Sequence, residues 1–332
     1  MAMKSAATFL AFLCGTLLLL PMGCKTLTVP SSKDALLLQL ASTGTADQVQ
    51  EAIQRGANVN AIDERNSWTP LLYAARDNNR PEVTFGLLRA GADINARTQG
   101  GLNALMEASG HNQNPEVAAV LLKAGVELDA QDYGGMTALM WAASSNSNPA
   151  VVSVLLEAGA TVTAKDGSGM TALLYAARSN QNPEVAAVLL KAGADINVRY
   201  KNGETVLMLA AGLNKNMDIV SALIVAGADI SARDAYGQTA LMYAATYNQS
   251  PEVAAALLKA GVELDAQDHG GMTALMWAAQ NNQNPELIIT LLKAGADGKV
   301  KDNQGLTAFD YAGSNAKLKG TNAYRQLEEA SQ

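Results

Sequence analysis

Threonine recurs at a fixed interval of 34 residues through most of this 332-residue chain. The threonines of the series are Thr69, Thr137, Thr171, Thr205, Thr239, Thr273 and Thr307, and Asn103 takes the one missing position. A longer segment, Gly135–Ala143, returns unchanged at Gly271–Ala279. A constant period of this length predicts a stacked array of structural repeats, in which each unit packs on its neighbours. Such an array forms an extended surface, which favours binding over catalysis in a pocket.

One unit, residues 169–202, contains the signals for two helices and a loop. Thr171 is a suitable N-cap for a first, alanine-rich helix. Asn182, Pro183 and Glu184 then form a typical start for a second helix, because proline needs no hydrogen-bond acceptor there and an acidic side chain suits the positive end of the helix dipole. Gly193 supplies the left-handed residue that commonly ends a helix. The polar residues that follow predict a projecting loop before the next threonine.

The pattern Thr-x-Leu-x-x-Ala-Ala, followed by Glu-Val and by Leu-Leu-Lys-Ala-Gly-Ala-Asp-Ile-Asn, resembles the ankyrin repeat over about residues 34–325. The resemblance implies an all-α solenoid of stacked helix-turn-helix units with projecting loops. We expect the repeat domain to span 34–332, with an N-terminal cap at 34–66, seven full repeats at about 67–304 and a C-terminal cap at 305–332.

Two features depart from that family. The period is 34 residues rather than 33, and the extra residue falls in the turn between the two helices. Methionine or leucine also replaces the usual histidine of the first helix, as at Met140 and Leu174. In the family that histidine forms hydrogen bonds between units, so we expect apolar packing to take over more of this role here.

The composition excludes several function classes. The formal charge is −7 and no cluster of Lys or Arg occurs, which argues against binding to nucleic acid. Cys14 and Cys24 are the only cysteines, and His111 and His269 are the only histidines, so neither residue type can form a metal cluster. Acidic residues recur at helix starts and after the glycine caps, as capping residues do. We therefore expect no enzyme activity, no catalytic residues and no cofactor.

The N-terminus has the pattern of a secretory signal over residues 1–23. Lys4 supplies the positive charge, an apolar run extends from Ala6 to Leu20, and the chain becomes polar at Lys25. The run is shorter than the roughly 20 residues that a membrane-spanning helix needs. An uncleaved anchor formed by 6–22 is the alternative.

Cys24 makes this signal more specific. The segment Leu20-Pro21-Met22-Gly23-Cys24 resembles the lipobox of bacterial lipoproteins, although Pro21 and Met22 depart from the usual residues. The resemblance implies that the chain is cut before Cys24, that Cys24 carries the lipid, and that residues 24–33 tether the repeats to a membrane. Several acyl chains would make this attachment stable. An ordinary cleaved signal with an incidental cysteine is the alternative.

Aromatic residues recur at one position of the first helix, directly before the Ala-Ala pair. In the ankyrin family this helix lines a concave groove, so the aromatic residues predict a row of anchors for a partner. The alternative is that the rings pack between adjacent first helices. Glu107 and Leu209 occupy the same position in two units. The predicted groove residues are Tyr73, Trp141, Tyr175, Tyr243, Trp277 and Tyr311.

The loop tips differ from unit to unit while the helices repeat. Variation on a constant framework is typical of a binding surface, although it also fits loops that vary freely. The loop residues that we predict to contact a partner are Tyr133, Arg199, Tyr200, Lys201, Arg233, Tyr236 and His269.

Together these features predict a monomeric, non-enzymatic scaffold that binds a protein partner through its groove and loop tips. The N-terminal signal would place it in a bacterial envelope, anchored by lipid and facing the periplasm or the cell surface. Two alternatives stay open: a glycan- or peptidoglycan-binding protein that stacks its aromatic row on sugar rings, and a secreted effector that acts on host proteins.

Overall fold

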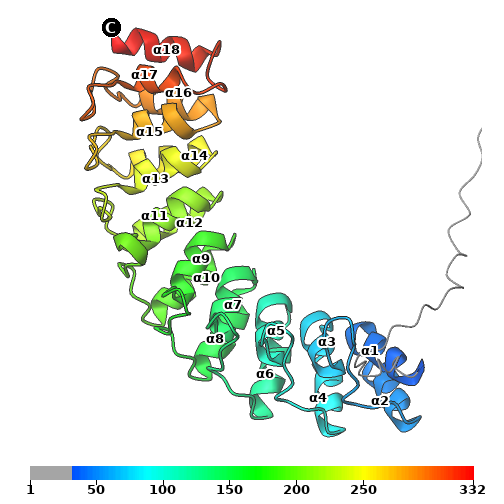
Figure 1. Ribbon diagram of the computed structural model, residues 1–332. Coiled ribbons are helices and arrows are strands. Elements are labelled where there is room, and N and C mark those ends of the chain that lie inside the picture. The colour runs from blue at the N-terminus through cyan, green and yellow to red at the C-terminus, as the bar shows by residue number, and fades with distance from the viewer. Residues whose placement is uncertain (1–31) are drawn as a thin grey trace, which may run out of the picture.

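The computed structural model describes residues 32–332, and this part of the chain is an arc of nine helix pairs (Figure 1). The signal segment, Cys24 and most of the tether lie outside the described residues. The first helices are α1 (Ser32–Thr43), α3 (Pro70–Asp77), α5 (Ala104–His111), α7 (Ala138–Ser145), α9 (Ala172–Ser179), α11 (Val206–Leu213), α13 (Ala240–Tyr247), α15 (Ala274–Asn281) and α17 (Ala308–Ala312).

The second helices run beside them along the arc. They are α2 (Ala46–Gln54), α4 (Pro81–Arg89), α6 (Pro115–Lys123), α8 (Pro149–Glu157), α10 (Pro183–Lys191), α12 (Met217–Val225), α14 (Pro251–Lys259), α16 (Pro285–Lys293) and α18 (Asn322–Ser331). One short 3-10 helix, η1 (Lys201–Gly203), lies in a loop. The all-helical solenoid expected from the sequence is confirmed, and helix α1 begins two residues before the predicted boundary at residue 34.

The curvature follows from the side chains of the first helices. Their alanine pairs, such as Ala142–Ala143 and Ala176–Ala177, are fully buried and let neighbouring first helices approach closely. First helices of adjacent units contact each other more extensively than second helices do. The closer packing of the first helices favours a bend toward them, and the face that they form with their aromatic positions is called the groove below.

The predicted caps of the repeat at 169–202 are present. The Thr171 side chain accepts a hydrogen bond from the Leu174 amide, and the Asn182 side chain accepts one from the Glu184 amide. Gly193 ends the second helix with a φ of +93°, a conformation that costs other residues energy. These local bonds fix the bounds of both helices, so each unit presents its groove face in the same way.

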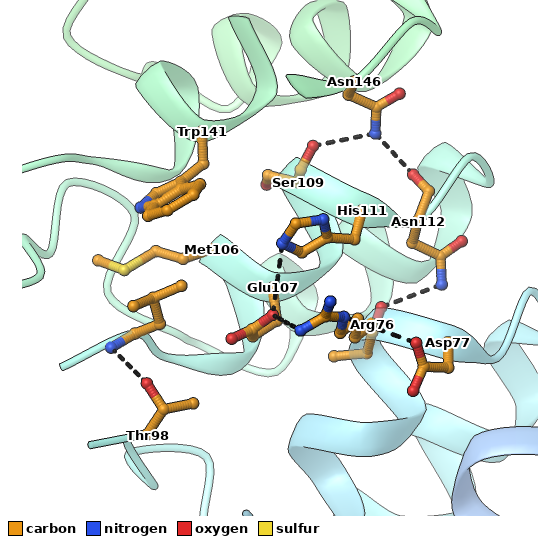
Figure 2. A network of polar contacts seen from close by, with 12 residues as sticks. Arg76, Asp77, Thr98, Met106, Glu107, Ser109, His111, Asn112, Trp141 and Asn146 are labelled. Atoms are coloured by element: carbon orange, nitrogen blue, oxygen red, sulfur yellow. Dashed lines mark hydrogen bonds and ion pairs between the residues drawn. The ribbon is translucent and has the colours of Figure 1, made fainter. Parts of the chain in front are cut away.

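Hydrogen bonds between units are supplied by a ladder of buried asparagines in the turn between the two helices. The Asn180 amide donates to the carbonyl oxygens of Ala143 and Asn146 at 2.9 and 2.8 Å. Asn146 in turn donates to the carbonyls of Ser109 and Asn112 (Figure 2). The ladder consists of Asn78, Asn112, Asn146, Asn180, Asn214, Asn248, Asn282 and Asn315.

The expectation that apolar packing replaces the inter-unit hydrogen bonds of the histidine was therefore wrong in part. Methionines do fill the histidine position, and Met140 and Met276 are buried. The hydrogen bonds, however, have moved to the inter-helix turn, where the lengthened repeat contains the ladder asparagine. A buried amide is well suited to this role because it can donate to two carbonyls at once.

Candidate functional site: the groove and the loop tips

Each aromatic side chain of the groove is hydrogen-bonded to an aspartate of the loop in its own unit. The Trp141 ring N–H donates to Asp132 Oδ2 at 3.0 Å, and the Tyr175 hydroxyl donates to Asp166 Oδ2 at 2.6 Å. The remaining pairs are Tyr73 with Asp63, Tyr243 with Asp234, Trp277 with Asp268, and Tyr311 with Asp302. All six predicted groove residues are thus tied to the loops rather than only packed between helices.

The other oxygen of each aspartate holds the loop in shape. Asp132 Oδ1 accepts hydrogen bonds from the amides of Gly134 and Met136 at 2.8 and 2.9 Å. Asp166 makes the same two bonds to Ser168 and Met170. One carboxylate therefore connects the shape of the loop to the position of the ring, and it makes loop and groove a single rigid unit.

The sequence contains a signal for this pairing that the repeat-by-repeat reading missed. In the full repeats that have an aromatic residue at the groove position, an aspartate lies nine residues earlier, or ten in the case of Asp63 and Tyr73. The two units without the ring also lack the aspartate: Thr98 precedes Glu107, and Tyr200 precedes Leu209. A donor ring and its acceptor thus occur together or not at all, as a structural pair would.

Hydrogen bonds join most of the neighbouring loop tips to each other. The Tyr133 amide donates to the Gly100 carbonyl and the His269 amide to the Tyr236 carbonyl, each crossing from one loop to the next. Arg199 Nη1 donates to the carbonyls of Gly203 and Arg233, both at 3.0 Å. Arg233 makes the equivalent bonds to Gly237 and Gln267. The predicted loop residues are therefore brought together along one edge of the array.

Their exposure differs. Tyr133 is 80% exposed and Tyr236 58%, so both rings face solvent. Lys201 is exposed and lies over the ring of the half-buried Tyr200, while His269 is exposed. In the groove, Tyr243 is only 7% exposed and offers little surface to a partner, whereas the other five rings are half-buried. Arg199 and Arg233 each use their Nη1 atom to donate hydrogen bonds to carbonyl oxygens of the loops.

Models of ankyrin repeats match nearly all of the array. A model of three ankyrin repeats matches residues 37–132, 78–166, 105–200 and 173–268, and a model of many copies matches 257–312. The chain belongs to the ankyrin repeat family. Its repeats support a protein–protein interaction scaffold, since ankyrin repeats are interaction modules that are generally not enzymes.

Two curated proteins share a short stretch with this ankyrin array. The mitochondrial disaggregases of Homo sapiens and Bos taurus are each 44% identical to it over 66 residues, which is 20% of this chain. The matched stretch covers 9% of the human protein and 10% of the bovine one. The likeness is therefore confined to about two repeats.

In the pair formed by Tyr311 and Asp302, the hydrogen bond shifts the pKa of both partners. The hydrogen bond from Tyr311 holds the pKa of Asp302 below its usual range, and the same bond, with burial, raises the pKa of Tyr311 to about 12. Burial and the bond to Asp166 likewise raise the pKa of Tyr175. At neutral pH Tyr311 is thus a neutral phenol and Asp302 a carboxylate, and their hydrogen bond stabilises the loop.

Within residues 32–332, no group of three or more His, Cys, Asp or Glu side chains is arranged to hold a metal ion. The same residues contain no helix that is both long and apolar enough to cross a bilayer.

Replacing Tyr175 by phenylalanine removes only the hydroxyl that reaches Asp166. We expect a loss of about 1–2 kcal/mol in the free energy of unfolding, because a charged acceptor loses its partner in a half-buried site. Urea denaturation would measure the change. Tyr133→Phe is the control, since the exposed Tyr133 ring should lose its hydroxyl without measurable cost; equal effects of the two substitutions would contradict the structural role of the pair.

Proposed function

We propose that this ankyrin array is a scaffold held on a bacterial envelope membrane through Cys24 and that it binds a protein partner along its groove. The observation that carries the proposal is the groove itself. Five half-buried aromatic side chains stand in a row along it, and hydrogen bonds to the loop aspartates fix each of them. Aromatic residues are favoured anchors at protein interfaces.

Rigidity supports binding as well as folding. Ordering a flexible side chain on association costs roughly 0.5–1.5 kcal/mol, and this cost is avoided when the side chain is already held. The Trp141 and Trp277 rings are held by equivalent bonds to Asp132 and Asp268. The groove is thus prepared to receive a partner without rearrangement, and the exposed rings of Tyr133 and Tyr236 extend the same surface at the loop tips.

Photo-crosslinking tests whether the partner lies in the groove. A photoreactive residue is placed at Ser145 or Ser179, which are exposed at the ends of first helices, and at Glu157 or Lys191, which are exposed on the second helices of the same units. We expect a crosslinked protein from envelope extracts at the first two positions only. Crosslinks at the second-helix positions alone, or sedimentation with cell-wall glycan and no crosslinked protein, would overturn the proposal.

The membrane attachment is a separate prediction, based on the apolar run that ends in Gly23-Cys24. Expressed in a bacterial host, the wild-type chain should incorporate labelled fatty acid and partition into detergent, because several acyl chains anchor a protein stably. Cys24→Ser should do neither, while Cys14→Ser should be labelled like the wild type if the chain is cut before Cys24. Equal labelling of the Cys24→Ser variant would refute the lipid anchor.

A further inference from the structure

The unit that contains Glu107 departs from the rest of the groove. Where five other full repeats place an aromatic ring on a loop aspartate, this unit has a carboxyl group at the ring position and Thr98 in the place of the aspartate. Thr98 Oγ1 accepts a hydrogen bond from the Leu102 amide. It holds the loop as the aspartates do in other units, but with an uncharged side chain. Glu107 has therefore no role in the pairing that explains its neighbours.

Glu107 is 2% exposed, and its Oε2 atom has no hydrogen-bond partner. Arg76 Nη1 and His111 Nε2 both lie 3.8 Å from this oxygen, as Figure 2 shows. Hydrogen bonds between nitrogen and oxygen are 2.7–3.2 Å long, so neither contact is one. Three polar side chains thus converge on one point of the groove, and no hydrogen bond joins Glu107 to the other two.

The neighbouring unit explains the burial. Gly110 has no side chain, and the Trp141 ring lies against it: a Cβ atom at Gly110 would be 3.6 Å from that ring. Trp141 also lies beside His111, with ring centroids 6.3 Å apart. On the opposite side, Arg76 lies over the Trp68 ring at 5.2 Å. Trp141 therefore lies beside His111 and Trp68 beside Arg76, while Glu107 is the most buried of the three polar side chains.

Burial raises the pKa of Glu107 to about 7, against the opposing effect of Arg76. Burial also lowers the pKa of His111. The ionisable groups facing Glu107 are Arg76 and Asp77 of α3 and His111 of α5; α7 contains none, and Glu116 and Lys123 of α6 are exposed. Near neutral pH the carboxyl is thus protonated in about half of the molecules, and a protonated carboxyl donates a hydrogen bond.

The accessible groups are donors. The side chains of Arg76 and His111 are 40% and 33% exposed, while that of Glu107 is 3% exposed. Asp77 lies 3.7 Å from Arg76 Nε and accepts a bond from Ser42 of α1, away from the Glu107 side of the guanidinium. An approaching ammonium group would first meet the charge of Arg76. A carboxylate would instead meet Arg76, the His111 ring and the proton of Glu107.

We propose that Arg76, Glu107 and His111 form a carboxylate-binding notch, in which the protein partner places an acidic side chain. This notch rests on the proposed function and adds the chemistry of the partner to it. A bound carboxylate oxygen would lie within reach of Arg76 Nη1, His111 Nε2 and the Glu107 hydroxyl. No covalent step is involved; where Glu107 is ionised, it takes up one proton from solvent as the carboxylate binds.

Proton uptake sets the sign of the pH dependence. If only the protonated form of Glu107 binds, the apparent affinity follows the fraction of that form. With a pKa of about 7, this fraction falls about tenfold between pH 6 and pH 8. Binding of a carboxylate should therefore weaken about tenfold over this range, whereas binding of a cation would strengthen.

Nuclear magnetic resonance of the two histidines tests the notch, because His111 lies in it and His269 is a control in a distant loop. The probes are N-acetylated, C-amidated tripeptides Leu-Glu-Leu, Leu-Gln-Leu and Leu-Lys-Leu, added to the array at millimolar concentrations. We expect Leu-Glu-Leu alone to shift the His111 ring signal to saturation and to leave His269 unchanged. A saturable shift with Leu-Lys-Leu, or none with Leu-Glu-Leu, would overturn the proposal.

Two variants assign the roles. Arg76→Gln should weaken binding of Leu-Glu-Leu at least tenfold. Glu107→Gln should keep the binding and lose its pH dependence, because the amide donates a hydrogen bond at every pH in a side chain of the same shape. Unchanged affinity in Arg76→Gln, or an unchanged pH dependence in Glu107→Gln, would refute the assignment. Thermal melting of both variants confirms that they are folded.

The outcome is distinguishable from a failure of the proposed function. If the tripeptides do not bind but the groove positions Ser145 and Ser179 still crosslink a protein, the notch is wrong and the scaffold function stands. If Leu-Glu-Leu binds and the groove crosslinks nothing, the chemistry of the notch is correct and the partner is not a protein of the envelope.

Discussion

Asn180→Ala is expected to lower the free energy of unfolding by about 3–5 kcal/mol, more than a surface substitution in the same turn. Asn180 is 3% exposed, and its amide donates to the Ala143 and Asn146 carbonyls while its oxygen accepts the Asn182 amide. The alanine variant leaves these three buried backbone groups without a partner. An unsatisfied buried group costs roughly 1–3 kcal/mol, and partial relaxation or entry of water reduces the sum.

Urea denaturation of the full array measures this loss, and Gln181→Ala is the matched control in the adjacent, exposed position. Gln181→Ala removes one exposed amide that donates to Asn214 Oδ1 at 3.3 Å, so it should change the stability by no more than about 1 kcal/mol. A loss below about 1 kcal/mol for Asn180→Ala would show that the ladder is dispensable. In that case the apolar contacts between units, rather than the asparagines, would replace the hydrogen bonds of the family histidine.

The sequence predicted those parts of the fold that depend on local chemistry. Thr171 and Asn182 cap their helices as expected, because a side-chain oxygen reaches an amide two or three residues away whatever surrounds it. Gly193 has the positive φ that its place after a helix indicated. The stacking of units followed from the period alone. None of these inferences required knowledge of what lies in the neighbouring repeat.

The missed features depend on contacts between units or between a loop and its helix. Asn180 lies in a segment that predicts only a turn, and its partners are 34 and 37 residues earlier in the chain. The repeat pattern relates Trp141 to the aromatic residues at the same position of other units. Its hydrogen-bond partner, however, is Asp132 in the loop of its own unit. The recurrence of both asparagine and aspartate at the 34-residue period was visible, but the period does not say which atoms meet.

Glu107 illustrates the limit most clearly. The sequence placed it in the groove row as an exception to the aromatic pattern, and that placement is correct. Around it, Trp141 of the next unit lies against Gly110, and Arg76 of the preceding unit lies 3.8 Å from Glu107 Oε2. Whether a carboxyl is exposed or enclosed determines its ionisation, so the raised pKa of Glu107 follows from the packing of two units and not from either unit alone.

Leu189→Ala should cost about 2–5 kcal/mol of the free energy of unfolding, because Leu189 is fully buried in α10 and its truncation leaves a cavity. The array contains its own control. Helix α6 has the same sequence as α10, and its Leu121 is equally buried. Leu121→Ala should therefore cost a similar amount, and urea denaturation of the two variants compares one substitution at two places in the stack.

The position of a unit in the stack determines whether a loss of stability affects the whole array or only part of it. An interior unit contacts neighbours on both sides, so weakening it weakens two interfaces and destabilises the array as a whole. Leu327 is also fully buried, but it lies in α18, the last helix of the described residues, which has a neighbouring unit on one side only within 32–332. In the Leu327→Ala variant the last unit can unfold locally while the rest of the array stays folded. The loss of stability is therefore no larger than the free energy of unfolding that unit. We therefore expect the global unfolding midpoint to fall for Leu189→Ala and Leu121→Ala, whereas Leu327→Ala should mainly increase hydrogen exchange in 308–331. Equal shifts of the midpoint for all three variants would mean that the nine units unfold as one body, with no weaker end.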